Sequence, residues 1–444
     1  MRKFRRSFVV LMHQFKLMLF VGFFLLNPIA NALTIEDAIN SALKVDPTLR
    51  ASKFNELATE ENIAIARSRL LPQISLQGSS SQLTQTTTQE LTTGGSASRS
   101  FTGPSVNHQF VIRQALLRPR ELSALRYAEL QTQYMALKYK ADVNDLKIKV
   151  FNAWIDLVGA QQIAQAYENP LKLMLAAAKQ ERARYEQGDS TKDAALEADA
   201  QYENAIASYK QATETLKSKQ SYFENLTKIP ASALAGKILP VDTLPVFSET
   251  DKAMLWGNFQ DASLELQMAK LQEQMQLERV KMAEADHKPT LDLLAAVNLA
   301  QNDATSTQGY QYRNKQVGVQ YTVPLFAGGG LTAGARQANL GYEASLAEGE
   351  ALLIRLANDF DASWGLILAN SSRMKAMNVG LASGREQVKA NSRGFELGVK
   401  SLADSANAQF AVARKMSDLI SVAQEYMKSI LKVSIKSLML ANID

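Results

Sequence analysis

The stretch YTVPLFAGGGLTAGARQA, from Tyr321 to Ala338, changes its residue pattern in the middle. Its first half alternates like a β-strand, with Val319, Tyr321 and Val323 on one side. After a run of three glycines the sequence becomes rich in Ala and Gln and keeps a helical pattern for about sixty residues. We therefore predict that a strand passes almost directly into a very long helix. Because glycine relaxes the backbone limits, the junction is assigned to Gly328, Gly329 and Gly330.

The N-terminal segment has the three parts of a secretory signal peptide. It starts with basic residues, continues with an apolar run at 17–26, and ends with Ala-Asn-Ala at 30–32, a typical cleavage site. The apolar run is too short to cross a membrane as a helix, so we predict that residues 1–32 are removed. The basic residues of this segment account for the whole formal net charge of +5. The mature chain is therefore near neutral, and its charge gives no reason to expect a nucleic-acid partner.

The composition argues against an enzyme. The chain has no cysteine, which excludes disulfides, thiol catalysis and a lipoprotein anchor. Its two histidines outside the signal peptide, His108 and His287, stand in different halves, which argues against a metal site. No catalytic triad, paired-carboxylate site or phosphate-binding glycine loop stands out. We predict no catalytic residue, no cofactor and no metal, and we interpret Trp154 and Trp364 as packing residues.

The chain repeats itself with a period near 210 residues. A shift of 210 places Trp154 on Trp364, and YEQG at 185–188 on FELG at 395–398. After each tetrapeptide, residues recur at alternating four- and three-residue steps, the heptad seam of helices that supercoil. A proline-containing segment connects the halves. The predicted divisions are a first repeat at 33–228, a linker at 229–250 and a second repeat at 251–444.

Both repeats begin with a shorter helix followed by a strand. The helices are predicted at 47–71 and about 264–287, and each ends at a proline. The strands are QISLQ at 73–77 and TLDLLAAVNL at 290–299. A Ser/Thr/Gly-rich loop follows each strand. We predict a long loop at 79–100 in the first repeat and a short one at 301–309 in the second.

A second strand then leads into a long helix in each repeat. In the first repeat this helix is predicted at 120–187 and starts beside Pro119. In the second it starts at the triple glycine. Helix breakers stand at matching places, Pro170 and Gly380, where we expect a kink or a swelling.

The four predicted strands of about ten residues alternate as membrane-spanning β-strands do. Four strands alone leave open edges, which a hydrocarbon environment does not tolerate. Three copies would supply twelve strands, the smallest pore that we consider. The predicted fold class is thus a mixed α and β membrane protein, in which a trimeric 12-stranded β-barrel continues into a long α-helical barrel.

Three stretches, LLPQISLQG at 70–78, VPLFAGGG at 323–330 and FELGVKSLAD at 395–404, occur within this duplicated plan. Together they resemble the TolC family of outer-membrane efflux proteins, over residues 33 to about 441. The resemblance implies a homotrimer whose barrel lies in the outer membrane and whose helical tunnel extends into the periplasm. It implies export from an efflux or type I secretion complex. A periplasmic adaptor and an inner-membrane transporter, either ABC or proton-driven, are the implied partners.

The resemblance also implies a gate at the periplasmic end, closed by drawing the second-repeat helical hairpin inward. This chain departs from the family's pattern at three of the gate positions. Phe395 stands in place of a tyrosine, Lys400 in place of an arginine and Asn407 in place of an aspartate. One carboxylate ring, that of Asp404, remains. The alternative for Asp404 is an aspartate at a helix start, favoured by the helix dipole. The implied gate residues are Asp193, Phe395, Lys400, Asp404 and Asn407.

Gly188 and Gly398 most simply end helices in left-handed caps. They also mark the two hairpin tips, where the resemblance implies that an adaptor docks. The tip sequence Gln-Gly-Asp at 187–189 is more polar than the tips of family members that suit drug-efflux adaptors. Drugs, a secreted protein and a polysaccharide-related cargo all fit this architecture.

Two other classes share parts of the pattern. A periplasmic adaptor also has a signal peptide and long helices, but it carries one hairpin flanked by β-rich modules. This chain instead has two copies of a hairpin, each with its own strand pair. A filamentous coiled-coil protein would lack both the alternating strands and the prolines that end the shorter helices. An export channel therefore explains more of these sequence features than a periplasmic adaptor does, and the adaptor is kept as the alternative.

Overall fold

The structure is a computed structural model that describes residues 34–234, 249–302 and 310–436, together with Leu239, Leu244 and Phe247. The predicted signal peptide, most of the linker and most of the loop at 301–309 lie outside these residues. The chain divides into two compact units. We call residues 53–138 and 267–351 the sheet unit, and the remaining residues the hairpin unit.

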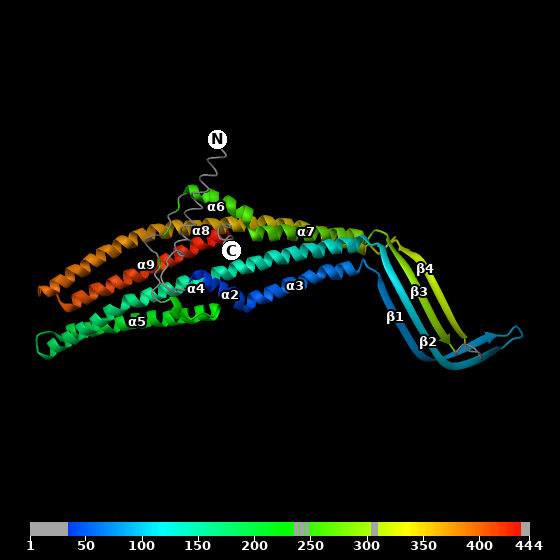
Figure 1. The fold of residues 1–444 in the computed structure, drawn as a ribbon, viewed down its shortest axis with the longest axis horizontal. Coiled ribbons are helices and arrows are strands. Elements are labelled where there is room, and N and C mark those ends of the chain that lie inside the picture. The colour runs from blue at the N-terminus through cyan, green and yellow to red at the C-terminus, as the bar shows by residue number, and fades with distance from the viewer. Residues whose placement is uncertain are drawn as a thin grey trace, which may run out of the picture. The chain divides into compact units, whose positions relative to one another are not determined.

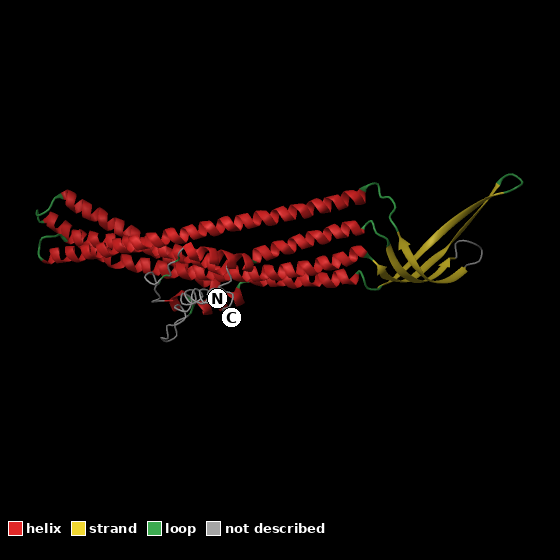
Figure 2. Cartoon of the chain, turned by 90° about the horizontal axis from the view of Figure 1, so that it is seen from above, coloured by secondary structure: helices red, strands yellow, loops and turns green. Residues whose placement is uncertain are grey.

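The sheet unit contains one antiparallel sheet in the order β1-β2-β3-β4 (Figures 1 and 2). Its strands are β1 (Gln73–Glu90), β2 (Ser96–Leu117), β3 (Thr290–Asn302) and β4 (Tyr310–Thr322). The predicted shorter helices are α3 (Pro47–Ser68) and α7 (Leu264–Ala285), and both end before the prolines as expected. In the residues described, no helix is both long enough and apolar enough to cross a bilayer.

The strand register separates an apolar face of the sheet from a polar one. Residues paired across neighbouring strands share a face, so each row of partners can be read as a unit. One row consists of Ile74, Ile112, Ala295 and Val317. A row on the opposite face consists of Gln77, Gln109, Asn298 and Asn314. In these rows the sheet is therefore apolar on one side and amide-rich on the other, although Arg313 and Lys315 of β4 also lie on the apolar side.

The long loop predicted at 79–100 is wrong. These residues extend β1 and β2, and only the short turn at 91–95 separates the two strands (Figure 1). The Ser and Thr residues that indicated a loop bond across the strand pair, for example Thr84 to Thr102 at 2.9 Å and Thr88 to Ser98 at 2.7 Å. Threonine also favours extended backbone. The first two strands are consequently 18 and 22 residues long, well beyond the predicted ten.

The two junctions between strand and long helix are built differently. Strand β2 ends at Leu117, and only Arg118 precedes Pro119, the first residue of α4 (Pro119–Glu186). Proline suits this position because a first-turn N–H has no helical partner. The Arg118 Nε donates to Asp292 of β3 at 2.9 Å, and a second, shorter bond makes the ion pair bidentate. This junction is therefore direct and tied to the sheet.

The second junction is longer than predicted. Strand β4 ends at Thr322, so Val323 is not part of the strand, and the next residue, Pro324, has no N–H to donate to a strand ladder. Gly328 and Gly329 have φ values of 60° and 80°, which L side chains rarely adopt. Gly330 begins α8 (Gly330–Glu396). The expected backbone role of the first two glycines is confirmed, whereas Gly330 has ordinary helical geometry.

The hairpin unit contains two pairs of long helices. Helix α4 runs into α5 (Lys192–Thr227), and α8 runs into α9 (Leu402–Lys436). The predicted long helix at 120–187 is observed one residue earlier at each end. The predicted heptad seams are confirmed, because none of their residues is exposed. Buried seam residues are Ala198, Ala205, Ala212 and Phe223 on α5, and Ala406, Ala413, Ile420 and Met427 on α9.

Two apolar clusters give this unit its core. The first contains Trp154 of α4 and Phe223 of α5, and short helix α2 (Ile35–Val45) packs against it. The second contains Trp364 of α8, joined by α6 (Glu249–Ala262). Helix α9 contributes to both clusters, with Ile420 in the first and Tyr426 in the second. The prediction that both tryptophans are packing residues is confirmed, since each is at most 3% exposed.

Replacing Phe223 should destabilise the hairpin unit. Phe223 is fully buried in the first cluster, so Phe223→Ala should cost about 3–5 kcal/mol of unfolding free energy, measured by denaturant unfolding of the purified protein. The control Phe223→Leu keeps most of the buried volume and should lose much less. Equal stability of the Ala and Leu variants would contradict this packing.

Candidate functional site

Both helical hairpins turn through the same backbone motif. Gly188 has a φ of 83° and donates its N–H to the Tyr185 carbonyl at 3.0 Å. Gly398 has a φ of 74° and donates to the Phe395 carbonyl at 3.0 Å. In each hairpin the next residue donates one carbonyl further back, which completes a Schellman cap. The predicted left-handed caps are confirmed, and both turns lie at the same end of the hairpin unit (Figures 1 and 2).

The helices that follow the turns start with side-chain caps. Thr191 accepts the Ala194 N–H at 3.3 Å, and Ser401 accepts the Asp404 N–H at 3.0 Å. In the second hairpin the bond is reciprocal, because the Asp404 carboxylate accepts the Ser401 N–H at 3.0 Å and its hydroxyl at 2.9 Å. This is a capping box. The bonds from Ser401, with a smaller contribution from the Lys400 charge, lower the pKa of Asp404.

The structure gives Asp404 the helix-start role that the sequence offered as the alternative. A capping carboxylate can still face a pore, so the gate assignment of Asp404 stays a prediction. Lys400 also belongs to the second turn, where its side chain lies beside Gly394. A Cβ on that glycine would lie 2.6 Å from the Lys400 Cγ.

The other predicted gate residues are exposed on single helices. Asp193 lies in the first turn of α5, and Asn407 lies in the second turn of α9. Phe395 is 40% exposed. Within the described part of one chain, Asp193 and Lys400 form no ion pair with each other or with another residue. The structure thus places these residues near the two turns but does not bring them into one cluster.

Two neutral bonds, which sequence reasoning missed, hold the second hairpin together near its tip. The Asn391 side-chain amide donates to the Asp404 carbonyl at 3.1 Å. The Ser392 and Ser405 hydroxyls lie 3.3 Å apart. Both bonds link the end of α8 to the start of α9. Near the second tip, α8 and α9 are therefore joined by hydrogen bonds of neutral amide and hydroxyl groups.

The first hairpin is fastened by an ion pair at the corresponding level. Arg182 of α4 pairs with Asp199 of α5 at 2.6 Å, whereas the Arg184–Glu181 pair at 3.1 Å lies within α4. A shift of 210 residues places Arg182 on Ser392, so aligning the repeats could have revealed this difference. Charged pairs on exposed helices contribute little stability but order a surface. The two tips therefore present different chemistry on the same backbone geometry.

The outer surfaces of the tips differ in the same way. The first turn exposes the polar residues Gln187 and Asp189. The second exposes Leu397, which is 78% accessible, and Val399, which is 74% accessible. Exposed apolar residues at a tip favour contact with another protein surface.

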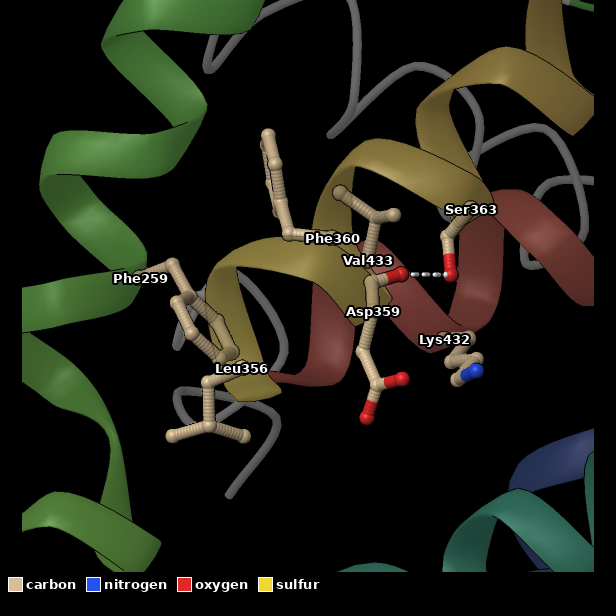
Figure 3. A pocket seen from close by; sticks show the side chains of 7 residues that line it. All are labelled: Phe259, Leu356, Asp359, Phe360, Ser363, Lys432 and Val433. Atoms are coloured by element: carbon tan, nitrogen blue, oxygen red, sulfur yellow. Dashed lines mark hydrogen bonds between the residues drawn. The ribbon is translucent and has the colours of Figure 1, made fainter. Parts of the chain in front are cut away.

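The hairpin unit contains cavities of different size. A cavity lined by α6, α8 and α9 has a volume of about 20 Å³, enough for one water molecule, and one of its lining residues, Ser363, donates to the Asp359 carbonyl within α8 at 2.7 Å (Figure 3). A larger cavity of about 450 Å³ lies between α4, α8 and α9. Among the described residues, no group of three or more His, Cys, Asp or Glu side chains could hold a metal ion.

A chain with an open four-stranded sheet that is apolar on one face, joined directly to two long helical hairpins, has the architecture of an outer-membrane export channel. A family model described as outer membrane efflux protein matches residues 38–227 and 257–432. The chain belongs to this family. Membership confirms the predicted family resemblance and the outer-membrane location, and it favours the channel over the periplasmic adaptor.

Relatives and solved structures agree with this assignment. The proteases secretion protein PrtF of Dickeya chrysanthemi is 24% identical, over 81% of this chain and 78% of its own length. The outer membrane protein TolC of Vibrio cholerae is 24% identical over 90% of each chain. The outer membrane protein VceC of Vibrio cholerae has the same fold, with a TM-score of 0.72, 14% identity and coverage of 91% of this chain and 95% of its own.

The role of Asp404 in the helix start predicts a specific pH dependence. Because its pKa is lowered in the folded protein, its stabilising contribution is present above the unfolded value of about 3.9 and is lost as the pH falls through the lowered value. Asp404→Ala should lower stability by about 0.3–1 kcal/mol at pH 7. The deficit should shrink as the pH falls below about 4 in thermal unfolding followed by circular dichroism.

Asp193→Ala is the matched control for this measurement. Asp193 lies in the corresponding turn of the first hairpin, but among the described residues its side chain forms no hydrogen bond. Its replacement removes no capping bond and should therefore change stability less. A pH-independent deficit in Asp404→Ala would show that the capping carboxylate is not the cause.

Proposed function

We propose that this chain assembles as a homotrimer whose twelve strands form one outer-membrane pore. The observation that carries the proposal is the open sheet: β1 and β4 each have a single neighbour. Their outer edges carry unpaired backbone groups, which hydrocarbon does not tolerate. Because neighbouring strands alternate in direction, β4 of one copy can pair antiparallel with β1 of the next. The apolar face then meets lipid, and the amide-rich face lines the pore.

The long helices continue the pore into the periplasm. Helices α4 and α8 contain 68 and 67 residues, so each measures roughly 100 Å at about 1.5 Å per residue. Three copies supply the twelve helices of the predicted tunnel. The junction residues Pro119, Gly328, Gly329 and Gly330 take the chain from strand to helix at the membrane surface.

The hairpin tips around Gly188 and Gly398 are the proposed docking points for a periplasmic adaptor. The exposed Leu397 and Val399 supply apolar contact area, and the polar Gln187 and Asp189 supply hydrogen bonds. An inner-membrane transporter completes the export path. The chain thus carries substrate from a periplasm-spanning complex to the outside.

A secreted protein is the proposed cargo, exported by a type I system with an ABC transporter. The name of PrtF, a proteases secretion protein, supports this choice. So does the polar first tip, which differs from tips that suit drug-efflux adaptors. Drug efflux is the second candidate, supported by the efflux description of the family.

The proposed periplasmic gate consists of Asp193, Phe395, Lys400, Asp404 and Asn407 around the three-fold axis. Three Asp404 carboxylates would repel one another and attract cations to the constriction. The capping box supports this arrangement because it keeps each carboxylate ionised and fixes its position. Lys400 adds a compensating positive charge one turn away.

The molecular mass of the purified protein tests the proposed homotrimer. The mature protein, purified from outer membranes in mild detergent, should have three times the mass of one chain by native mass spectrometry. Removing the barrel edge by deleting β4 should abolish the trimer, because β1 of the neighbouring copy would lose its partner. A stable, folded monomer of the intact chain would contradict the proposal.

The gate is tested by charge reversal. Lys400→Glu places a further negative charge beside each Asp404, so the closed state should lose stability and the conductance of the purified channel in a planar bilayer should rise severalfold. Each ~1.4 kcal/mol lost changes the open-to-closed ratio tenfold. The control Lys375→Glu makes the same charge change at an exposed site on α8, away from the second turn, and should leave the conductance unchanged. Equal conductance of both variants would place the gate elsewhere.

A further inference from the structure

Two cationic side chains lie on the face of the sheet that is otherwise apolar. Arg313 and Lys315 of β4 alternate with their neighbours in the same phase as Val317, so they point to the same side of the strand. On its opposite side β4 has only uncharged residues at these levels, namely Tyr312, Asn314, Gln316, Gly318 and Gln320. Strand β4 therefore directs its charges away from the amide-rich face.

The apolar part of this face begins beside the junction between β4 and α8. Tyr321, Val319 and Val317 follow one another on this side of β4, and they are 75%, 57% and 78% exposed in the single chain. Their partners on β3 are also apolar, namely Leu291, Leu293 and Ala295. At the helix end of the sheet, this face thus forms an apolar band.

The two cations stand where the apolar band ends. Continuing along β4, the next residues on this side are Lys315 and then Arg313. Beyond Ser105, where pairing with β3 ends, the described part of β2 pairs with β1 alone (Figure 1). There the residues of β1 on this face carry amides and hydroxyls, namely Gln82, Thr84, Thr86 and Thr88. Along the strands the face changes from apolar to basic to hydroxyl-rich.

Strand geometry places Arg313 near the outer boundary of the hydrocarbon layer. It lies eight residues from Tyr321, or about 26 Å along the strand at ~3.3 Å per residue. A strand tilt of about 45° reduces this to a rise of roughly 19 Å, compared with an apolar band of about 25 Å in membrane barrels. The long arginine side chain can cover the remaining distance. Because the helices extend into the periplasm from the other end of the sheet, this boundary belongs to the outer leaflet.

Neither cation has an anionic partner within the described part of the chain. Arg313 and Lys315 are exposed, and no ion pair or side-chain hydrogen bond involves them there. A cation on the lipid face of a barrel is destabilising near the bilayer centre and is tolerated only near the headgroups. Its position at the end of an apolar band is therefore complementary to an anionic headgroup.

His108 of β2 adds a third polar group to the same face. It belongs to the row of Arg313, from which β3 separates it, so the two residues are about 10 Å apart at ~4.8 Å between strands. Its exposed ring lies over Gly78 of β1, where an added Cβ would be 3.0 Å from the Nδ1 atom. The ring can donate a hydrogen bond towards the same headgroup.

We propose that Arg313, Lys315 and His108 form a binding site for the phosphate groups of an outer-leaflet lipid. The planar guanidinium of Arg313 binds a phosphate through two parallel hydrogen bonds, and the Lys315 ammonium adds a point charge from the row below. Lipopolysaccharide supplies such phosphates on its membrane-embedded part, lipid A. The acyl chains of the lipid would then lie along the apolar band. The inference rests on the proposed function in that this face of the sheet meets lipid.

Binding of purified lipid A to the delipidated trimer in mild detergent tests the site. Native mass spectrometry during a titration gives the number of bound lipids and their affinity. Arg313→Gln combined with Lys315→Gln should weaken binding at least tenfold, because charge-assisted bonds to phosphate are lost. The matched control is Arg113→Gln, which removes an exposed cation of β2 in the row of Gln73 and Leu294, on the opposite face. It should bind lipid A as the unmodified chain does.

The lipid itself supplies a test that needs no variant. Lipid A without its phosphates should bind the unmodified trimer at least tenfold more weakly than phosphorylated lipid A. Inorganic phosphate at the same concentration should not displace the lipid, because the acyl chains add apolar contact. Equal binding of the two lipids would overturn the proposal. Complete displacement by inorganic phosphate would overturn the assignment to a lipid.

A charge-conserving exchange separates loss of the site from misfolding. Arg313→Lys combined with Lys315→Arg keeps both cations and should retain most of the binding. Equal affinity of the double glutamine variant and the unmodified chain would also overturn the proposal. Trimer mass and conductance are measured for every variant. A conducting trimer without preference for phosphorylated lipid A would contradict only the lipid site, whereas a folded monomer of the unmodified chain would contradict the proposed pore.

Discussion

The backbone hydrogen bonds at the two edges of the sheet are the constraint on which the rest of the molecule depends. In water an open edge is tolerable, but in hydrocarbon each unpaired N–H or C=O costs several kcal/mol. Strands β1 and β4 have free outer edges within one chain, and the sheet carries an apolar face beside them. In the proposed assembly, closure by other copies would satisfy those groups and, at the same time, turn the amide-rich face towards a pore.

The long helices meet a different constraint, because the wall of the proposed tunnel would have no thick core. Most of their buried contacts are small or single-layered, such as the alanines of the α5 and α9 seams. Larger side chains concentrate where α2 and α6 cover the long helices, around Trp154 and Trp364. The bulkiest packing is therefore in this part of the hairpin unit, whereas three of the four buried residues in the cluster nearer the tips are alanines.

Duplication produced two similar halves that have since diverged in chemistry. The first junction is tied to the sheet by Arg118 and Asp292, whereas the second passes through glycines with positive φ. The first tip is fastened by an ion pair between α4 and α5 and the second by neutral bonds. In both respects the second repeat has fewer charged connections.

Periodic features were readable from the sequence alone. The heptad seams, the duplicated order of elements, the helix ends before Pro72 and Pro289 and the caps at Gly188 and Gly398 all follow from local rules, and the structure agrees. The lengths of β1 and β2 could not be predicted from the sequence. Ser and Thr occur in both loops and strands, and pairing with a neighbouring strand decides between the two. The same holds for Val323, which alternates like a strand residue although Pro324 ends the ladder.

The site depends still more on tertiary structure. That Asp404 caps its own helix, that Asn391 reaches its carbonyl, and that Gly159 makes room for Gln424 are facts about residues brought together by the turns and by helix packing. The clearest case is Asp156, whose two lysine partners come from different repeats and stand 63 and 272 residues away. Sequence periodicity determines which face of a helix is buried. Only the folded chain decides which polar groups meet across that face, because their partners depend on distance in space.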